Sequence, residues 1–224
     1  MRQSRPTDDV IVLAGGDAVA AEHARHLPPT ATVIAADSGL AAAVPLGVTV
    51  DLVVGDLDSV DPADLDAAVA AGVPVDRHPV DKDRTDLAIA MDAAAALDPI
   101  RVTVVGGAGG RLDHLLANAL LLASPAYAGI EVVAHMGTAT VTVVRDVATL
   151  TGLPGELVSL LPVHGPARGV SATGLRFSLD GEDLHAGSSR GISNAFDSAT
   201  ASVRVTSGIL LAVQPGTLEP TIDR

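Results

Sequence analysis

Short apolar runs alternate with longer Ala- and Leu-rich stretches over residues 10–125. Runs that are apolar at every position are typical of strands covered on both faces of a parallel sheet, and the stretches between them have the composition of crossover helices. We therefore expect an open, mostly parallel sheet with helices between its strands. The expected strands are residues 10–13, 31–35, 50–54, 73–75 and 100–105, and the expected helices are residues 18–26, 39–44, 62–71, 85–97 and 111–123.

The pattern changes after about residue 130, where short Val-, Thr- and Leu-rich runs are separated by Gly, Pro and Asp and no helical period is found. Such runs are typical of a small antiparallel sandwich or barrel. The expected strands there are residues 138–144, 157–161, 175–179, 202–205 and 209–213. The sequence thus predicts two domains: a Rossmann-like α/β domain in residues 1–137 and a small antiparallel β-sandwich in residues 138–224.

Composition excludes several classes of protein. The chain carries 14 Lys and Arg against 27 Asp and Glu, and 1% of its residues are aromatic. A net-negative surface with so few stacking side chains argues against nucleic-acid binding. The single lysine, Lys82, lies between two aspartates without the glycines of a P-loop, and the absence of Cys excludes disulfides and thiol nucleophiles. The polar start and the short apolar run 10–14 predict a cytoplasmic protein.

Most of the excess negative charge lies between residues 37 and 113, where the aspartates follow the expected strands. Asp37 comes after strand 31–35, Asp56 and Asp58 come after strand 50–54, and the Asp83–Asp86 segment follows strand 73–75 by a loop. Because the carboxyl ends of parallel strands lie along one edge of a sheet, we expect these clusters to converge on one crevice.

Asp56 and Asp58 are separated by one residue in a turn that begins with Gly55. Capping of a turn or helix explains a single aspartate, as it does for Asp61, but hardly two so close together. Neighbouring carboxylates repel unless a cation lies between them, and Mg²⁺ prefers such oxygen ligands together with substrate phosphates. The pair therefore predicts a site for a divalent metal.

A glycine-rich segment, residues 106–110, follows strand 100–105 and precedes the helix expected at 111–123. Glycines at this place let backbone N–H groups approach an anion at a helix N-terminus, although the segment does not match the dinucleotide pattern G-x-G-x-x-G. Arg111, His114 and Asn118 share one face of the helix, and the first two suit phosphate contact. Metal-binding carboxylates, a glycine loop and an Arg/His pair together indicate phosphoryl or pyrophosphoryl transfer.

Four segments, residues 36–39, 55–59, 81–86 and 109–114 with Asn118, resemble the thiamine pyrophosphokinase family in their order and spacing, and residues 191–194 are similar to its C-terminal motif. The resemblance implies an α/β domain followed by a β-sandwich, assembled as a homodimer with active sites at the subunit interface. The implied reaction converts ATP and thiamine to AMP and thiamine diphosphate with Mg²⁺.

The resemblance also implies a role for each matching residue. The implied catalytic residues are Asp37, Asp56, Asp58 and Asp86, of which Asp56, Asp58 and Asp86 would bind the metal. The implied ATP-binding residues are Asp83, Thr85, Gly109, Gly110, Arg111, His114 and Asn118. The implied thiamine-binding residues are Ser193, Asn194 and Phe177.

Phe177 stands where the family usually has Trp, and the alternative for it is a core position in the sandwich. Two other functions stay open at this point. One is a non-catalytic nucleotide-binding relative with the same fold, and the other is a pyrophosphokinase that acts on another small alcohol.

Overall fold

The computed structural model describes residues 8–216 and divides into two compact units. The first contains the chain up to Leu121 together with Gly129–Gly137, and the second contains Leu122–Ala128 together with the chain from Thr138 onward. The sequence-based boundary, between residues 137 and 138, is one of the points at which the chain passes between the units. No helix within residues 8–216 is long and apolar enough to cross a membrane.

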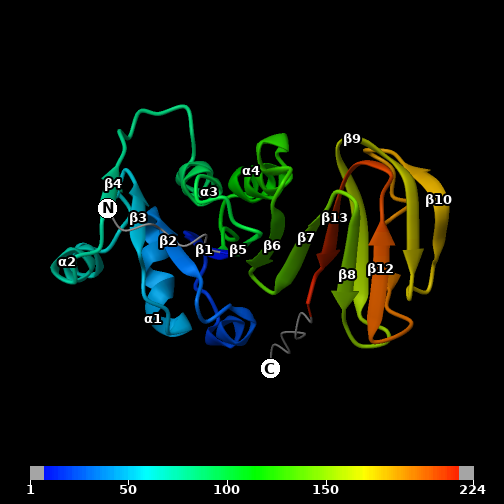
Figure 1. Ribbon diagram of the computed structural model, residues 1–224, viewed down its shortest axis with the longest axis horizontal. Coiled ribbons are helices and arrows are strands. Elements are labelled where there is room, and N and C mark those ends of the chain that lie inside the picture. The colour runs from blue at the N-terminus through cyan, green and yellow to red at the C-terminus, as the bar shows by residue number, and fades with distance from the viewer. Residues whose placement is uncertain (1–7, 217–224) are drawn as a thin grey trace, which may run out of the picture. The chain divides into compact units, whose positions relative to one another are not determined.

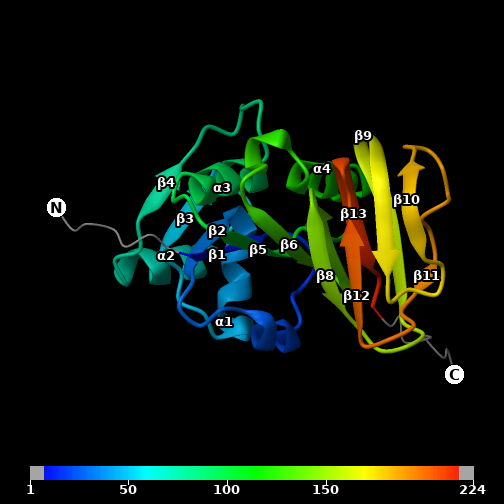
Figure 2. The same cartoon turned by 45° about the vertical axis from the view of Figure 1, so that its right-hand side comes forward.

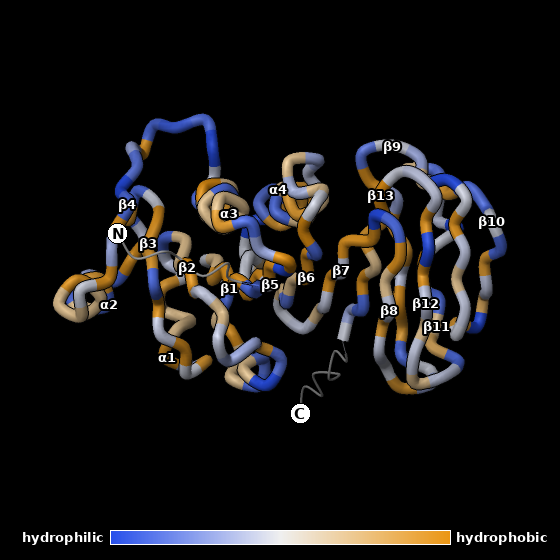
Figure 3. The backbone as a smooth tube through the Cα atoms, viewed as in Figure 1, coloured by the Kyte–Doolittle hydropathy of each residue, from blue (hydrophilic) through white to orange (hydrophobic). Residues whose placement is uncertain are grey.

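The first unit is built on a parallel sheet of six strands in the order β4-β3-β2-β1-β5-β6 (Figure 1). The strands are β1 Asp9–Ala14, β2 Thr32–Ala36, β3 Leu52–Gly55, β4 Val75–Arg77, β5 Arg101–Gly106 and β6 Glu131–Met136. The expected parallel sheet is confirmed, and β1 and β5 at its centre are hydrophobic along most of their length (Figure 3). We did not expect β6, because Glu131 and His135 interrupt its apolar run.

Helices cover both faces of this sheet. The elements are η1 Ala21–His26, η2 Asp37–Ala42, α1 Ala43–Leu46, α2 Pro62–Ala70, α3 Asp86–Ala95 and α4 Leu112–Leu122. Both α3 and η2 pack on β1, β2 and β3, and α3 and α1 lie on opposite sides of the sheet (Figure 1). One core fills the η2 side, with Ile11, Leu13 and Val53 from the strands packed against Leu40 and Leu46.

Two of the expected helices differ from the observed ones. Residues 18–26 form only the 3₁₀ segment η1, and residues 39–44 fall across η2 and the short α1. Gly47 ends α1 in the left-handed conformation, with φ of 64°. The better predicted helices carry clear caps: Asp61 accepts a hydrogen bond from the Ala63 N–H at the start of α2, and Thr85 accepts one from the Ala88 N–H at the start of α3.

The second unit is antiparallel, as expected. Besides the 3₁₀ turn η3 Pro125–Tyr127, its elements are β7 Ala139–Val144, β8 Val147–Thr151, β9 Leu157–Thr173, β10 Leu179–Leu184, β11 Asn194–Ala195, β12 Thr200–Arg204 and β13 Ser207–Gln214. The first half of β9 pairs with β13, and the second half pairs with β10 and β12 (Figure 2). His164 and Gly165, both with positive φ, lie between the halves. Two sheets that share β9 thus enclose a core that includes Val158, Leu160 and Phe196.

The strand expected at residues 175–179 is wrong. Leu175 makes only an isolated bridge with Phe196, and β10 begins at Leu179. Gly174 has φ of 76°, and the side chain of Asn194 hydrogen-bonds the backbone of Phe177. Only at Phe177 does a side chain, that of Asn194, take the place of a strand partner, because the Arg176 N–H donates to the Ala195 carbonyl oxygen.

Candidate active site

The order of the strands places a ligand site between β1 and β5. The chain winds outward from β1 to β4 in one direction and from β5 to β6 in the other, so the strand order reverses between these two neighbours. In open α/β sheets, ligands bind at the carboxyl ends of the strands at such a switch point. Two glycine segments occupy this position: the first glycine loop, Gly15-Gly16 after β1, and the second glycine loop, residues 106–110, which begins at the last residue of β5.

The two glycine loops pack backbone against backbone. The Gly107 N–H donates to the Gly15 carbonyl oxygen at 3.0 Å, and the Asp17 N–H donates to the Ala108 carbonyl oxygen at 2.8 Å. A Cβ atom on Gly16 would lie 2.1 Å from the Ala108 carbonyl oxygen. Only glycine therefore permits this approach. The first loop was missed in the sequence, although two glycines directly after a buried strand were a usable signal.

A cavity of about 620 Å³, the main cavity, opens beside these loops. Most of the residues predicted to bind ATP or to take part in catalysis line it: Asp37, Asp58, Thr85, Asp86, Gly109, Gly110, Arg111, His114 and Asn118. Asp56 does not line it, but one of its carboxylate oxygens lies within 4.8 Å of an oxygen of Asp37 and of Asp58, which do. Asp83 lines a different cavity of about 540 Å³, together with Asp76, His78 and Lys82. The structure therefore brings the predicted residues together with the exception of Asp83.

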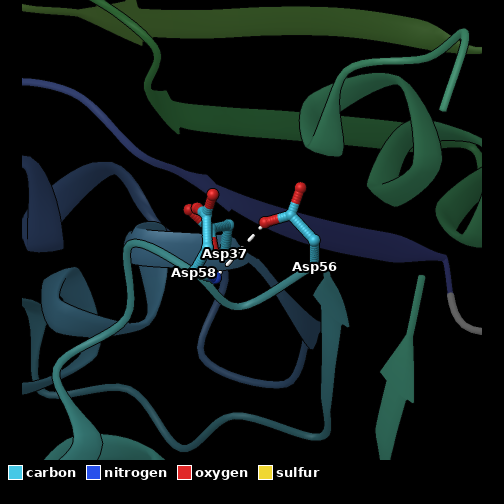
Figure 4. Close-up of side chains that lie close together, drawn as sticks. All are labelled: Asp37, Asp56 and Asp58. Atoms are coloured by element: carbon cyan, nitrogen blue, oxygen red, sulfur yellow. Dashed lines mark hydrogen bonds between the residues drawn. The ribbon is translucent and has the colours of Figure 1, made fainter. Parts of the chain in front are cut away.

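Three aspartates from two strand ends form a three-carboxylate group (Figure 4). Asp37, Asp56 and Asp58 each offer one oxygen, and these oxygens lie within 4.8 Å of one another. The Asp58 N–H donates to Asp56 Oδ1 at 3.3 Å. Leu57, between Asp56 and Asp58, has φ of 64°, so the turn is strained. Its buried side chain anchors this turn, and the aspartates on either side of it both belong to the three-carboxylate group.

Asp37 gives the strongest indication of a cation. Its Oδ1 atom is buried and has no hydrogen-bond partner among the described residues. Burial raises the pKa of Asp37, an effect that its hydrogen bond from the Ser38 backbone opposes and that repulsion from Asp86, Asp56 and Asp58 increases. Buried polar oxygens are rarely left without a partner. An unpartnered carboxylate oxygen beside two further carboxylates is a donor set that suits a hard divalent cation.

Asp86 lies outside the three-carboxylate group and is held by Lys82. The Lys82 ammonium forms an ion pair with Asp86 Oδ1 at 3.2 Å and a second, very short one with Asp56 Oδ2. The hydrogen bond from Lys82 is the main reason why the pKa of Asp56 is lowered. Asp37 is thus the third member of the group where we expected Asp86, and a metal-binding role for Asp86 stays a prediction. Lys82 was not among the predicted site residues, although its position between Asp81 and Asp83 was a usable signal.

The other wall of the main cavity carries the residues expected to contact phosphate. His114 and Arg111 are exposed at the start of α4, and the Arg111 guanidinium pairs with Asp113 at 2.6 Å. This pair lowers the pKa of Asp113 to about 2. Asn118 does more than line a polar helix face, because its Nδ2 donates to the Gly107 carbonyl oxygen at 3.0 Å. Asn118 therefore fixes the second glycine loop to α4.

The three residues predicted to bind thiamine lie together in the second unit. Asn194 is buried and hydrogen-bonds Phe177, whereas Ser193 is exposed and has φ of 58°. The Ser193 N–H donates to Ser159 Oγ at 3.1 Å. Phe177 is 56% exposed, so the alternative that it is a core residue is wrong. Phe196, 1% exposed, is the phenylalanine of that core.

Comparisons with known proteins cover both units. The family model "Thiamin pyrophosphokinase, catalytic domain" matches residues 24–134, and "Thiamin pyrophosphokinase, vitamin B1 binding domain" matches residues 140–210. Thiamine pyrophosphokinase 1 of Oryza sativa subsp. japonica is 25% identical over 70% of this chain, and the match spans 62% of the rice protein. Thiamine pyrophosphokinase of Bacillus subtilis (strain 168) is 24% identical over 81% of this chain and 86% of its own.

Solved structures show the same fold. A crystal structure of thiamine pyrophosphokinase from Bacillus subtilis has a TM-score of 0.82 at 22% identity, with 94% of this chain and 100% of that chain covered. The fold class predicted from the sequence, an α/β domain followed by a β-rich one, is confirmed. Because the two family models match most of the chain, in the order in which its two units follow each other, the chain belongs to the thiamine pyrophosphokinase family.

Proposed function

We propose that this protein transfers the pyrophosphoryl group of ATP to the hydroxyl of thiamine, with Mg²⁺, and releases AMP and thiamine diphosphate. The observation that carries the proposal is the three-carboxylate group, Asp37, Asp56 and Asp58, beside a cavity lined by two glycine loops. Charge neutralisation and positioning supply most of the catalysis in phosphoryl transfer, and this site offers both. Family membership supports the same reaction.

We assign different roles in the reaction to the residues in and beside the main cavity. The three-carboxylate group would hold Mg²⁺, which, when bound, neutralises the phosphate oxygens and polarises the attacked phosphorus. The glycine loops present backbone N–H groups to the polyphosphate, and Arg111 and His114 add side-chain donors at its edge. We assign to Asp86 the hydrogen bond to the acceptor hydroxyl, because its carboxylate lines the cavity outside the three-carboxylate group.

The second unit supplies the proposed acceptor site. The exposed ring of Phe177 offers an aromatic face to the cationic thiamine ring system, and Asn194 holds the backbone of Phe177 in place. Ser193, in the adjacent exposed turn, offers a hydroxyl. The net charge of −13 attracts a cationic acceptor.

Assembly and location complete the proposal. We propose a homodimer with active sites at the subunit interface, in the cytoplasm, as the sequence predicts. Light scattering of the purified protein tests the assembly, and an active monomer would contradict it.

A second candidate function is pyrophosphoryl transfer to another small alcohol, favoured by Phe177 at a position where the family usually has Trp. One experiment separates the candidates. The protein is incubated with ATP, Mg²⁺ and either thiamine or a panel of other primary alcohols, and AMP is followed. AMP formed with thiamine supports the proposal, AMP formed only with another alcohol supports the second candidate, and no AMP with any acceptor supports a non-catalytic nucleotide-binding protein.

A matched variant connects activity to the site. Asp56→Asn keeps the size of the side chain and removes one charge from the three-carboxylate group. We expect a loss of activity of roughly 100-fold or more with an unchanged circular dichroism spectrum. Asp61→Asn, which alters only the cap of α2, is the control and keeps the activity. A fully active Asp56→Asn protein would contradict the metal assignment.

A further inference from the structure

Lys82 already occupies part of the acidic site with a positive charge. Its ammonium contacts Asp56 and Asp86, which are 26 and 4 residues away in the chain, and both contacts are largely shielded from solvent. The exposed fractions of the side chains are 13% for Lys82, 9% for Asp56 and 27% for Asp86. No other lysine exists in the sequence. Its ammonium therefore offsets part of the repulsion among the converging carboxylates.

The contact of Lys82 with Asp56 conflicts with a divalent ion at the same carboxylate. Asp56 belongs to the three-carboxylate group, so a metal there and the Lys82 ammonium would share one acidic side chain. Like charges a few ångströms apart in a shielded environment repel strongly. The two oxygens of Asp56 can take different partners, but repulsion between the two cations favours a weaker or broken ion pair between Lys82 and Asp56 once the metal enters.

The surroundings of Lys82 give it room to move. It lies in the loop between β4 and α3, outside any helix or strand, on a flexible four-carbon side chain. Residues 82–84 of this loop line the 540 Å³ cavity, whereas residues 85–87 line the main cavity. The loop thus runs from the 540 Å³ cavity, which Lys82 lines, to the main cavity, where the nucleotide phosphates are proposed to bind.

We propose that Lys82 is an exchangeable cation: it pairs with Asp56 and Asp86 in the metal-free protein, yields Asp56 to the divalent ion, and then pairs with phosphate oxygens of the bound nucleotide. The inference rests on the proposed function for its last step only. The exchange keeps the ammonium beside negative charge in both states, and it frees Asp86 for the acceptor hydroxyl.

Metal binding measured without nucleotide or acceptor tests the first step. Mg²⁺ or Mn²⁺ alone is titrated calorimetrically into the whole protein and three variants. Lys82→Gln removes the competing charge, so we expect metal affinity to rise roughly fivefold or more. Lys82→Arg keeps a positive charge that competes with the metal, so its metal affinity should stay within about twofold of that of the unchanged protein. Arg84→Gln is the matched control, because Arg84 lies in the same loop and pairs with Asp92 instead; its affinity stays within about twofold.

Thermal unfolding shows that the variants fold and gives a second readout. Without metal, Lys82→Gln melts below the unchanged protein because its carboxylates repel, and added Mg²⁺ raises its melting temperature more than that of the unchanged protein. Unchanged or weaker metal binding by Lys82→Gln would overturn the inference, as would an equal gain in Arg84→Gln. Neither readout needs thiamine or turnover, so failure of the proposed function leaves the first step tested.

The last step is tested with ATP. We expect Lys82→Gln to bind the metal–ATP complex at least roughly tenfold more weakly, although it binds the metal alone more tightly. Tighter binding of both the metal alone and the metal–ATP complex would overturn the phosphate contact.

Discussion

Two hydrogen bonds join the side-chain amide of Asn194 to the backbone of Phe177: the Phe177 N–H donates to Oδ1 at 3.0 Å, and Nδ2 donates to the Phe177 carbonyl oxygen at 2.7 Å. Oδ1 also accepts from the Ala195 N–H at 2.9 Å. The buried Asn194 side chain is therefore committed to holding the segment that carries the exposed Phe177 ring. In the proposed acceptor site, Asn194 contributes by placing Phe177.

Replacing Asn194 by Asp keeps the acceptor oxygen and removes the N–H donor to the Phe177 carbonyl. We expect the free energy of unfolding of the second unit to fall by about 1–3 kcal/mol, because a buried carboxylate is introduced and a hydrogen bond is lost. Urea unfolding measures the change. Ser193→Ala, at the exposed neighbouring position, is the control and should stay within about 0.5 kcal/mol of the unchanged protein. Equal stability of the two variants would contradict the assigned role.

Phe177→Ala tests the aromatic face of the acceptor site. Because the ring is 56% exposed, its loss changes stability little, whereas the KM for thiamine should rise roughly tenfold through loss of stacking and cation–π contact. Steady-state kinetics at saturating ATP give this value. Phe177→Trp restores the residue type usual in the family, so its KM should equal or fall below that of the unchanged protein. Wild-type kinetics in Phe177→Ala would place the acceptor elsewhere.

Asp37→Asn should stabilise the metal-free protein while it removes activity. Burial raises the pKa of Asp37, so stability is lost as the pH rises from the ordinary pKa of Asp to this raised value, and the cost is complete above it. At neutral pH we expect the melting temperature of the variant without metal to be roughly 2–4 °C higher, because solvent screening of this partly buried group limits the gain. The advantage should vanish in acid, where Asp37 is protonated. A variant that melts lower at neutral pH would contradict the account.

His135 predicts how stability changes in mild acid. Its ring stacks on those of His23 and His26, with centroids 5.2 and 5.5 Å away, and burial followed by repulsion from these two histidines lowers its pKa to about 4. When the pKa of a histidine is lower in the folded than in the unfolded protein, the folded protein keeps its full stability above the unfolded-state pKa and loses stability as the pH falls toward the folded-state pKa. The first unit should therefore lose about 1–3 kcal/mol as the pH falls from about 6.5 to about 4.

Chemical denaturation across this pH range measures the effect. His135→Gln removes the titrating group and should flatten the pH dependence of the unfolding free energy. His185→Gln, at an exposed position in the second unit, should leave the dependence unchanged. A slope in His135→Gln equal to that of the unchanged protein would contradict the assignment.

Much of the first unit could be predicted because its central strands are apolar along most of their length. Strands β1, β2 and β5 lie where continuous runs of Val, Ile and Ala indicate them, and Asp37, Asp56 and Asp58 follow strand ends directly. The parallel topology alone then brings these acids to one edge. Strand β6 was not predicted because Glu131 and His135 interrupt its apolar run.

The features that escaped prediction depend on contacts distant in the sequence. The pairing of Lys82 with Asp56 follows from the path of the loop before α3, which no local pattern encodes. From its position on a polar helix face, Asn118 could not be told apart from a solvent-exposed residue, but its side chain hydrogen-bonds the second glycine loop. Phe177 could equally have been a core residue of the second unit, but Phe196 is the phenylalanine of that core. Local composition gave no means to separate these alternatives.

The central claim is transfer of an intact pyrophosphoryl group, and ATP labelled at its β-phosphorus tests it most directly. The labelled ATP is incubated with the protein, Mg²⁺ and thiamine, and the label is followed in each product. The account predicts that the label leaves ATP in thiamine diphosphate, with one unlabelled AMP for each molecule formed. Label retained in ADP, or thiamine monophosphate as the first product, would contradict it.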